Sequence, residues 1–364
     1  MDAFRIVSAR LARGAVTGLI AIAMPHAASA AGACPGAPPP IAAQLSASEG
    51  GAVACSHPLC LAFYATDPAH PSRAAAAEAG ACSGETLIRR DMAALVAAGG
   101  ILVLGEVHDN PVHHRLRGIL LRQLSGSAPP PGLVLEQLRA DQQPEIEAFE
   151  ALPAEKRSMD ALLGAISWDR SGWSKYPYGP LLEAALDGGY PLVAGDGPRD
   201  LVRTAARQGV AALTAAERTR LALTTSLGTD QDQAMLREIE DSHCGMLPAS
   251  ALEGMVFSQR VRDAYLADAA LQAAVGHRAA VMLIGNGHAR TDRGAPWYVR
   301  QRDPTRPVAA VLLIEVDEAR TDPEAYLPRS PQGTPAADYV IFTPRAERED
   351  PCAEMRRRAP RRQG

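Results

Sequence analysis

The chain has 364 residues, a formal net charge of −4 at pH 7 and a hydrophobic fraction of 47%. This mildly acidic balance argues against nucleic-acid binding, and the arginine-rich stretch over 356–362 is only a short tail. The length fits one large domain or two small ones, with enough apolar residues for a core. We predict four parts: a signal peptide (1–30), an irregular arm (31–84), an α/β domain (85–320) and a C-terminal extension (321–364).

The first 30 residues have the pattern of a secretory signal peptide. Arginines at positions 5, 10 and 13 precede an apolar stretch over 15–23, which is too short to span a bilayer. Ala28-Ser29-Ala30 is a small-residue cleavage site, and no later stretch is long enough for a transmembrane helix. We therefore expect an exported protein, either soluble in a bacterial periplasm or attached to the outer membrane by a lipid at Cys34. The alanines before Cys34 make a poor lipidation motif.

The chain contains six cysteines, an even number that favours disulfides in an exported protein. They are Cys34, Cys55, Cys60, Cys82, Cys244 and Cys352. Six cysteines allow 15 pairings, so the sequence does not fix the connectivity. Four of the six lie in the arm, which we expect to be pinned by disulfides.

From residue 86 onward, apolar patterns predict helices and strands in alternation. The predicted helices, in chain order, cover 87–98, 112–124, 143–152, 159–166, 180–186 and most of 200–274. The predicted strands cover 101–104, 133–135, 191–194, 281–284, 308–316 and, as an edge strand, 339–342. This alternation indicates an α/β fold with a mostly parallel β-sheet covered by helices, and with additional helical insertions.

Polar side chains follow three of these apolar strands. Glu106 and His108 come after the first, Glu136 after the second, and His288 after the strand over 281–284. Ligand sites of open α/β sheets lie at the carboxyl ends of the strands, so these four side chains are expected to converge. Such a set suits Zn²⁺, Fe²⁺ or Mn²⁺, or a metal-free acid–base pair. The alternative is that the glycines only turn the chain and the histidines cap helices.

Several segments together resemble the ChaN-type haem-binding uptake proteins of the Tiki superfamily, which also includes Tiki proteases and erythromycin esterases. They are LGEVHDNPVHH over 104–114, the strand ending at Glu136, residues 168–180, HCGMLP over 243–248, QRVRD over 259–263 and GNGHAR over 285–290. The resemblance covers roughly residues 87–316 and implies an α/β fold, haem binding and a link to iron acquisition. It also implies a rival function, since Glu106, His108, Glu136 and His288 match the shared core of the superfamily. That rival is a metal-dependent esterase or peptidase.

A haem site needs an apolar surface, an axial ligand and cations for the propionates. Trp168, Trp173, Tyr176 and Tyr178 fall within eleven residues of a chain with 16 aromatics (3 Trp, 8 Tyr and 5 Phe). They could form a porphyrin platform or merely a packed loop. The candidate axial ligands are Tyr176, Tyr178, His113 and His114, and the candidate propionate partners are Arg115, Arg199 and Arg290. The expected partners are haem or another small molecule, and a second copy of the chain in a homodimer.

Two further polar groups have competing interpretations. Asp196 and Arg199 follow another strand end and could line the same cleft. Gln259, Arg262 and Asp263 share one face of a predicted helix, through their i, i+3 and i+4 spacing. That face could be a buried polar surface directed at the cleft or a set of salt bridges on the helix surface.

Overall fold

The structure is a computed structural model that describes residues 37–48, 50–74, 82–126 and 129–358. The predicted signal peptide, its cleavage site and Cys34 lie outside these residues. Within the described part of the chain, no helix has the length and hydropathy needed to cross a membrane.

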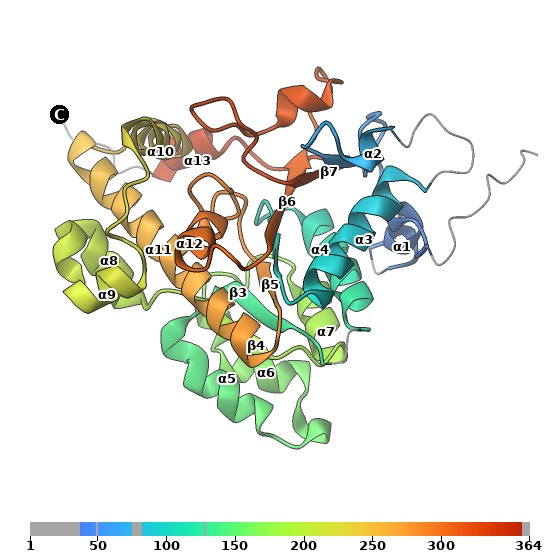
Figure 1. The fold of residues 1–364 in the computed structure, drawn as a ribbon, viewed down its shortest axis with the longest axis horizontal. Coiled ribbons are helices and arrows are strands. Elements are labelled where there is room, and N and C mark those ends of the chain that lie inside the picture. The colour runs from blue at the N-terminus through green and yellow to red at the C-terminus, as the bar shows by residue number, and fades with distance from the viewer. Residues whose placement is uncertain (1–36, 49, 75–81, 127–128, 359–364) are drawn as a thin grey trace, which may run out of the picture.

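The described residues form one seven-stranded sheet with the strand order β1-β7-β6-β2-β5-β3-β4 (Figure 1). Every neighbouring pair is parallel except β1 and β7. This confirms the mostly parallel α/β sheet predicted from the sequence. The strands are β1 (Phe63–Ala65), β2 (Ile101–Leu104), β3 (Gly132–Arg139), β4 (Leu192–Asp196), β5 (Ala280–Leu283), β6 (Val308–Glu315) and β7 (Tyr339–Thr343).

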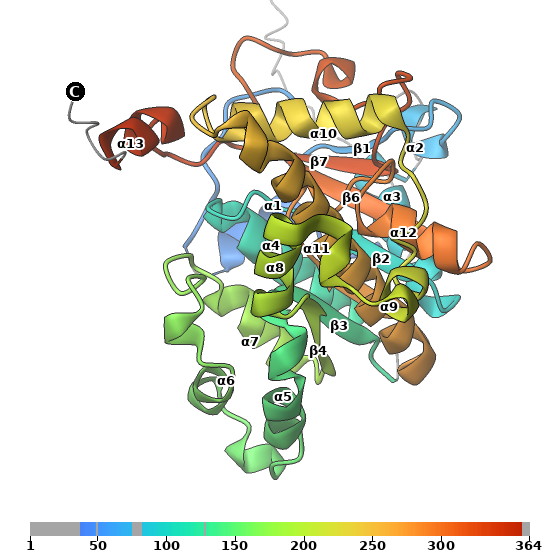
Figure 2. The ribbon, with the colours of Figure 1, turned by 90° about the vertical axis from the view of Figure 1, so that its left-hand side faces the viewer.

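Helices cover both faces of the sheet (Figures 1 and 2). One face packs against α3, α4 and α7, and the other packs mainly against α11, with α12 beside it. The helices are α1 (Ile41–Ala47), α2 (Pro71–Ala74), α3 (Gly84–Ala97), α4 (Pro111–Leu124), α5 (Gln143–Glu150), α6 (Met159–Ala165), α7 (Gly179–Asp187), α8 (Arg199–Gln208), α9 (Ala215–Arg220), α10 (Thr229–Ser242), α11 (Ala249–Gly276), α12 (Ala295–Arg302) and α13 (Pro351–Arg358).

The fully apolar strands are explained by the two covered faces. In β2, Leu102 and Leu104 lie in the core under α4 and α7, whereas Ile101 and Val103 lie in the core under α11. Successive side chains of a strand point to opposite faces, so a strand buried on both faces has no polar position. The same alternation decides to which face each polar side chain beyond the strand end is directed.

Strands from the predicted arm and from the predicted C-terminal extension both belong to the sheet. The arm is not wholly irregular, because α1 packs against α4 and β1 pairs antiparallel with β7. The edge strands are therefore β1 and β4, and the 339–342 strand that we placed at the edge is β7, between β1 and β6. A strand of only three residues inside a Pro- and Ala-rich stretch has too little alternation to be recognised.

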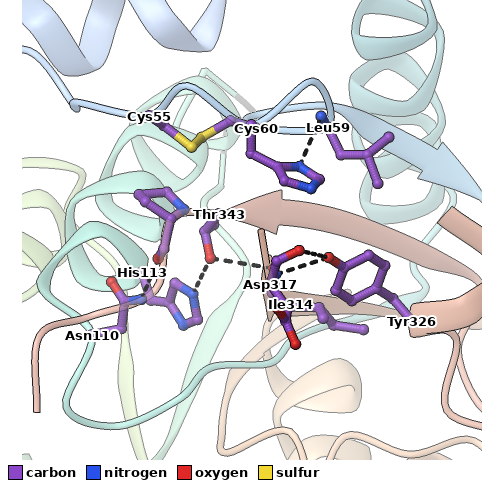
Figure 3. Close-up of a disulfide and its surroundings, with 11 residues drawn as sticks. Cys55, Leu59, Cys60, Asn110, His113, Ile314, Asp317, Tyr326 and Thr343 are labelled. Atoms are coloured by element: carbon purple, nitrogen blue, oxygen red, sulfur yellow. Dashed lines mark hydrogen bonds between the residues drawn. A yellow bond between two sulfur atoms is a disulfide. The ribbon is translucent and has the colours of Figure 1, made fainter. Parts of the chain in front are cut away.

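Two disulfide bonds link described segments of the chain. Cys55 bonds to Cys60 near β7 (Figure 3), and Cys244 at the end of α10 bonds to Cys352 in α13. Cys82 is also disulfide-bonded, and no described cysteine is free. The expectation of an oxidised protein is thus confirmed for the described cysteines.

Removing the Cys244–Cys352 bond should lower the free energy of unfolding by about 2–4 kcal/mol. Removing Cys55–Cys60 should cost less, because the two bonds span 108 and 5 residues and a longer loop restricts the unfolded chain more. Urea unfolding of the two double Cys→Ser variants measures both effects. Equal losses, or a larger loss for the short loop, would contradict this expectation.

Candidate functional site

The structure brings the four polar side chains that follow β2, β3 and β5 to one edge of the sheet. His108 Nδ1 lies 2.8 Å from Glu106 Oε1, and His108 Nε2 lies 3.8 Å from Glu136 Oε1. His288 Nε2 lies 3.5 Å from the same Glu136 oxygen. The four therefore form one cluster centred on the Glu136 carboxylate. The imidazole of His108, one third exposed, is its most accessible member.

Glu106 is completely buried on the α4 face and has five polar neighbours. Besides His108, they are Arg117, Tyr178, Gln137 and His114. Arg117 forms an ion pair with it, and the Tyr178 hydroxyl donates a hydrogen bond of 2.5 Å. Burial lowers the pKa of Arg117 to about 10, so the guanidinium stays charged at neutral pH. Glu106 is thus held in place by Arg117 and Tyr178, and it orients the His108 ring through Nδ1.

Glu136 lies on the opposite face, under α11, and is held by Arg262 and a backbone amide. Arg262 Nη2 donates to Oε1 at 2.8 Å, and the Gly285 N–H donates to Oε2 at 2.6 Å. Burial alone raises the pKa of this carboxyl, but His288, His108, Arg262 and the amide outweigh burial and hold the pKa below its usual range. Gly285 is needed here because a Cβ atom would lie 2.8 Å from the His108 ring.

The polar face of α11 is directed at the site. Asp263 Oδ1 lies 2.6 Å from His288 Nδ1, and Gln259 Nε2 lies 3.3 Å from His288 Nε2. Arg262 bridges Glu136 and Asp196, with Nε 3.0 Å from each Asp196 oxygen. Of the two interpretations of this helix, the structure therefore shows the buried polar face.

His113 and His114, two of the predicted axial ligands, lie in the interior of the protein. His113 Nδ1 accepts from the Val107 N–H at 2.8 Å, and Nε2 lies 2.7 Å from Thr343 Oγ1 (Figure 3). His114 Nε2 lies 2.9 Å from the His108 carbonyl oxygen. Both rings are fully buried because α4 begins immediately after the turn and directs its first turn inward. They support the loop that carries His108 and do not face the cleft.

Stability should fall as the pH drops from about 6.5 to 4, because burial lowers the pKa of His113 to about 3 and that of His114 to about 4. Above pH 6.5 both rings are neutral in the folded and unfolded chains. Below pH 6.5 the unfolded chain binds protons at these rings but the folded chain does not. For His113 alone, this lowers the free energy of unfolding by on the order of 2–3 kcal/mol at pH 4.5. Thermal unfolding from pH 7.5 to 4.5 measures this slope. The double variant His113→Gln/His114→Gln should lose less stability than the wild type over this pH range. An equal loss would show that the two histidines do not cause the pH dependence.

A cleft of about 180 Å³ opens beside the cluster. Its lining residues are Glu136, Arg139, Ser171, Trp173, Asp196, Gly197, Arg199, Val202 and Arg203. The ring centroid of Trp173 lies 4.9 Å from that of His108, edge to face. His108 is therefore a neighbour of the cleft through its contact with Trp173, and Glu136 is the member of the cluster that lines it.

The predicted aromatic platform divides into a buried pair and an accessible pair. Trp168 and Tyr178 are buried against each other, with the Tyr178 hydroxyl bound to Glu106. Trp173 and Tyr176 are half-buried, and their ring centroids lie 6.3 Å apart. In the described part of the chain the Tyr176 hydroxyl has no hydrogen-bond partner. Of the predicted ligands, only Tyr176 is accessible.

The predicted propionate partners lie in different places. Arg199 lines the cleft, whereas Arg290 binds Asp292 at 2.6 Å and Arg115 binds carbonyl oxygens of the arm. Sequence reasoning missed four polar residues near the site: Arg117, Gln137, Arg139 and Arg203. The i, i+4 spacing of Arg199 and Arg203 on a predicted helix beside a strand end was the available indication for the last of these.

The donor set does not fit a divalent metal, which was one of the alternatives that the sequence left open. Both oxygens of Glu106 are engaged by Arg117, Tyr178 and His108, and this carboxylate lies on the other face of the sheet from Glu136. Among the described residues, no group of three or more His, Cys, Asp or Glu side chains is arranged to hold a metal ion.

The family model for haem-binding uptake proteins of the Tiki superfamily, ChaN, matches residues 92–299, more than half of the chain. The chain belongs to this ChaN family. The fold agrees: a Campylobacter jejuni structure described as cofacial heme binding to ChaN is similar, with a TM-score of 0.53 and 20% identity. The match covers 69% of this chain and 90% of that one.

A second structure, an erythromycin esterase EreC mutant in its open conformation, is only weakly similar. Its TM-score is 0.35 at 16% identity, over 74% of this chain and 82% of the esterase. No curated protein matches this chain.

Proposed function

We propose that this protein binds haem at the cleft beside the His108–Glu136–His288 cluster. The proposal rests on one observation: in a chain of the haem-binding ChaN family, the cleft at the strand ends has Trp173 in its wall, with Tyr176 beside it. A porphyrin has two large apolar faces, and an indole face is a suitable surface for one of them.

The residues at the cleft fit a ferric haem. Tyr176 has an unpartnered hydroxyl next to Trp173, and a tyrosine oxygen is a known type of haem-iron ligand. The imidazole of His108 is the alternative ligand, because its Nδ1 is fixed by Glu106 and its Nε2 is directed to the cluster. When bound, haem would supply a redox-active iron, and the chain would supply the ligand, the apolar wall and the surrounding charges.

The dimensions of the cleft favour a partly exposed haem. Its volume of about 180 Å³ is below the ~300–1,000 Å³ of pockets that enclose a ligand. The cleft would therefore enclose only part of a haem and leave the rest of the ring exposed. The similar Campylobacter jejuni structure is described by cofacial haem binding, and an open face in this chain would accept a second ring in the same way. A homodimer, which would bring two such faces together, stays a prediction that light scattering can test.

We further propose that the protein is exported to a periplasm and takes part in iron acquisition. The described cysteines are all in disulfides, which persist in oxidising compartments and are rare in the cytosol. The family description of haem-binding uptake supports the second point.

The test is a hemin titration of a Trp173→Ala variant against a matched Trp297→Ala control. Trp297 lies on α12 beside Tyr298 and does not line the cleft. Loss of the Trp173 face should weaken hemin binding about tenfold, equivalent to ~1.4 kcal/mol. The control should keep the wild-type affinity. If Trp173→Ala and Trp297→Ala bind hemin with equal affinity, hemin does not bind at this cleft.

Hydrolysis without a metal is the second candidate function. It is favoured by two carboxylate–histidine pairs, Glu106–His108 and Asp263–His288, whose Nε2 atoms both approach Glu136. Each pair has the arrangement of a general base oriented by an acid, and only His108 is accessible. Ester or peptide hydrolysis that survives EDTA and is lost in His108→Gln would support it. Absence of turnover in the wild-type protein would leave haem binding alone.

A further inference from the structure

The lining of the cleft has an excess of positive charge. Three arginines line it, against two carboxylates, Glu136 and Asp196. Both carboxylates are already engaged by the guanidinium of Arg262, at 2.8 Å and 3.0 Å. Arg262 thus offsets part of the negative charge of these two acids, and the three lining arginines leave the cleft with a net positive charge.

Two of these arginines have no partner in the described structure. Arg199 and Arg203 are exposed and form neither an ion pair nor a side-chain hydrogen bond with any described residue. They lie four residues apart on α8, so they share one face of the helix, and both border the same cleft.

The third arginine, Arg139, lies at the end of β3. Arg139 aligns with Asp196 of β4, and its Nε lies 3.3 Å from the half-exposed Asp141. This contact uses one of the five donors of the guanidinium. Three guanidinium groups, one from β3 and two from α8, thus retain free donors beside the same cleft.

We infer that the cleft selects ligands that carry carboxylate groups, and that for haem the propionates bind Arg139, Arg199 and Arg203. This inference rests on the proposed haem binding and adds the group by which the ligand is recognised. Guanidinium and carboxylate form paired, charge-assisted hydrogen bonds, which fix orientation as well as adding affinity. The porphyrin would then lie with its iron near Trp173 and Tyr176 and its propionate edge toward α8.

The test compares hemin with hemin dimethyl ester, in which the carboxylates are blocked, in one solvent mixture. Three proteins are titrated: wild type, Arg199→Gln/Arg203→Gln, and the control Arg207→Gln, which changes an exposed arginine of α8 that does not line the cleft. We expect the wild type to bind hemin at least about tenfold more tightly than the diester. The double variant should lose this preference by weakening for hemin alone, and Arg207→Gln should retain it.

The outcomes separate this inference from the proposed function. Equal wild-type affinity for hemin and the diester would overturn carboxylate selection and leave haem binding intact. An undiminished preference in the double variant would also overturn the assignment to Arg199 and Arg203. If neither compound gives a saturable spectral change, both the haem function and this inference are wrong. Far-UV circular dichroism of each variant confirms that a lost preference does not come from unfolding.

Discussion

Replacing Arg117 by methionine is expected to lower the free energy of unfolding by about 3–5 kcal/mol. Arg117 and Glu106 are both fully buried and form an ion pair with each other. Removal of the guanidinium leaves the Glu106 carboxylate without its cation in the interior, which is the costly way to break a buried pair. Urea or thermal unfolding of the variant gives the magnitude.

Two further variants show whether the loss arises from the unpaired charge. In Arg117→Met/Glu106→Gln neither member of the pair is charged, so the double variant should recover part of the stability lost by Arg117→Met. Arg122→Met changes an exposed arginine of the same helix and should alter stability by less than about 0.5 kcal/mol. A double variant less stable than Arg117→Met would contradict the role of the pair.

Replacing Tyr176 by phenylalanine is expected to change the absorption spectrum of the hemin complex and to weaken binding by at least about tenfold. The substitution removes the only accessible tyrosine oxygen next to Trp173 but keeps the aromatic ring. A lost iron ligand changes the ligand field, whereas a lost apolar contact does not. Absorption spectroscopy at saturating hemin measures the first effect, and the titration measures the second.

Tyr178→Phe is the matched control for this prediction. The Tyr178 hydroxyl is buried and donates to Glu106, so its removal should lower stability by about 1–3 kcal/mol without altering the spectrum. If Tyr176→Phe keeps the wild-type spectrum, Tyr176 is not the ligand. His108 then becomes the residue to substitute.

Most of the fold was predictable because it depends on local patterns. The strand over 101–104 was predicted at its observed bounds, and the helix over 112–124 differs by one residue from α4. Apolar runs that end at glycine specify strands buried on both faces, and Asn110 before Pro111 begins α4 as a helix cap. The pairing of β1 with β7 could not be predicted, because it joins three residues to a segment more than 270 positions away.

The sequence predicted which residues form the site, but it did not predict to which face of the sheet each side chain is directed. Glu106 lies two positions beyond Leu104 and shares its α4 face, whereas Glu136 lies one position beyond Leu135 and points to the α11 face. Leu104 and Leu135 both align with Leu283, so this difference depends on the register of three parallel strands. A single sequence does not contain that register, and a shared metal site would have required both carboxylates on one face.

The sequence did not predict that His113 points into the core, for a similar reason. Whether the first turn of a helix faces solvent or core depends on the loop that precedes it and on the β7 residue Thr343, which binds the ring. Arg117 is a charged residue in a helix and was indistinguishable from a surface arginine until its buried partner was placed. The disulfide partners of Cys244 and Cys55 likewise depend on the folded chain, not on spacing.

The measurement that tests the central claim most directly is an absorption titration of the wild-type protein with hemin, in the absence of imidazole and added metal. We predict a shifted Soret band that saturates at one or two equivalents of hemin and is diminished at equal concentrations by Trp173→Ala. A titration without a saturable shift would contradict haem binding by this chain. It would favour the second candidate function, hydrolysis at the Glu106–His108 and Asp263–His288 pairs.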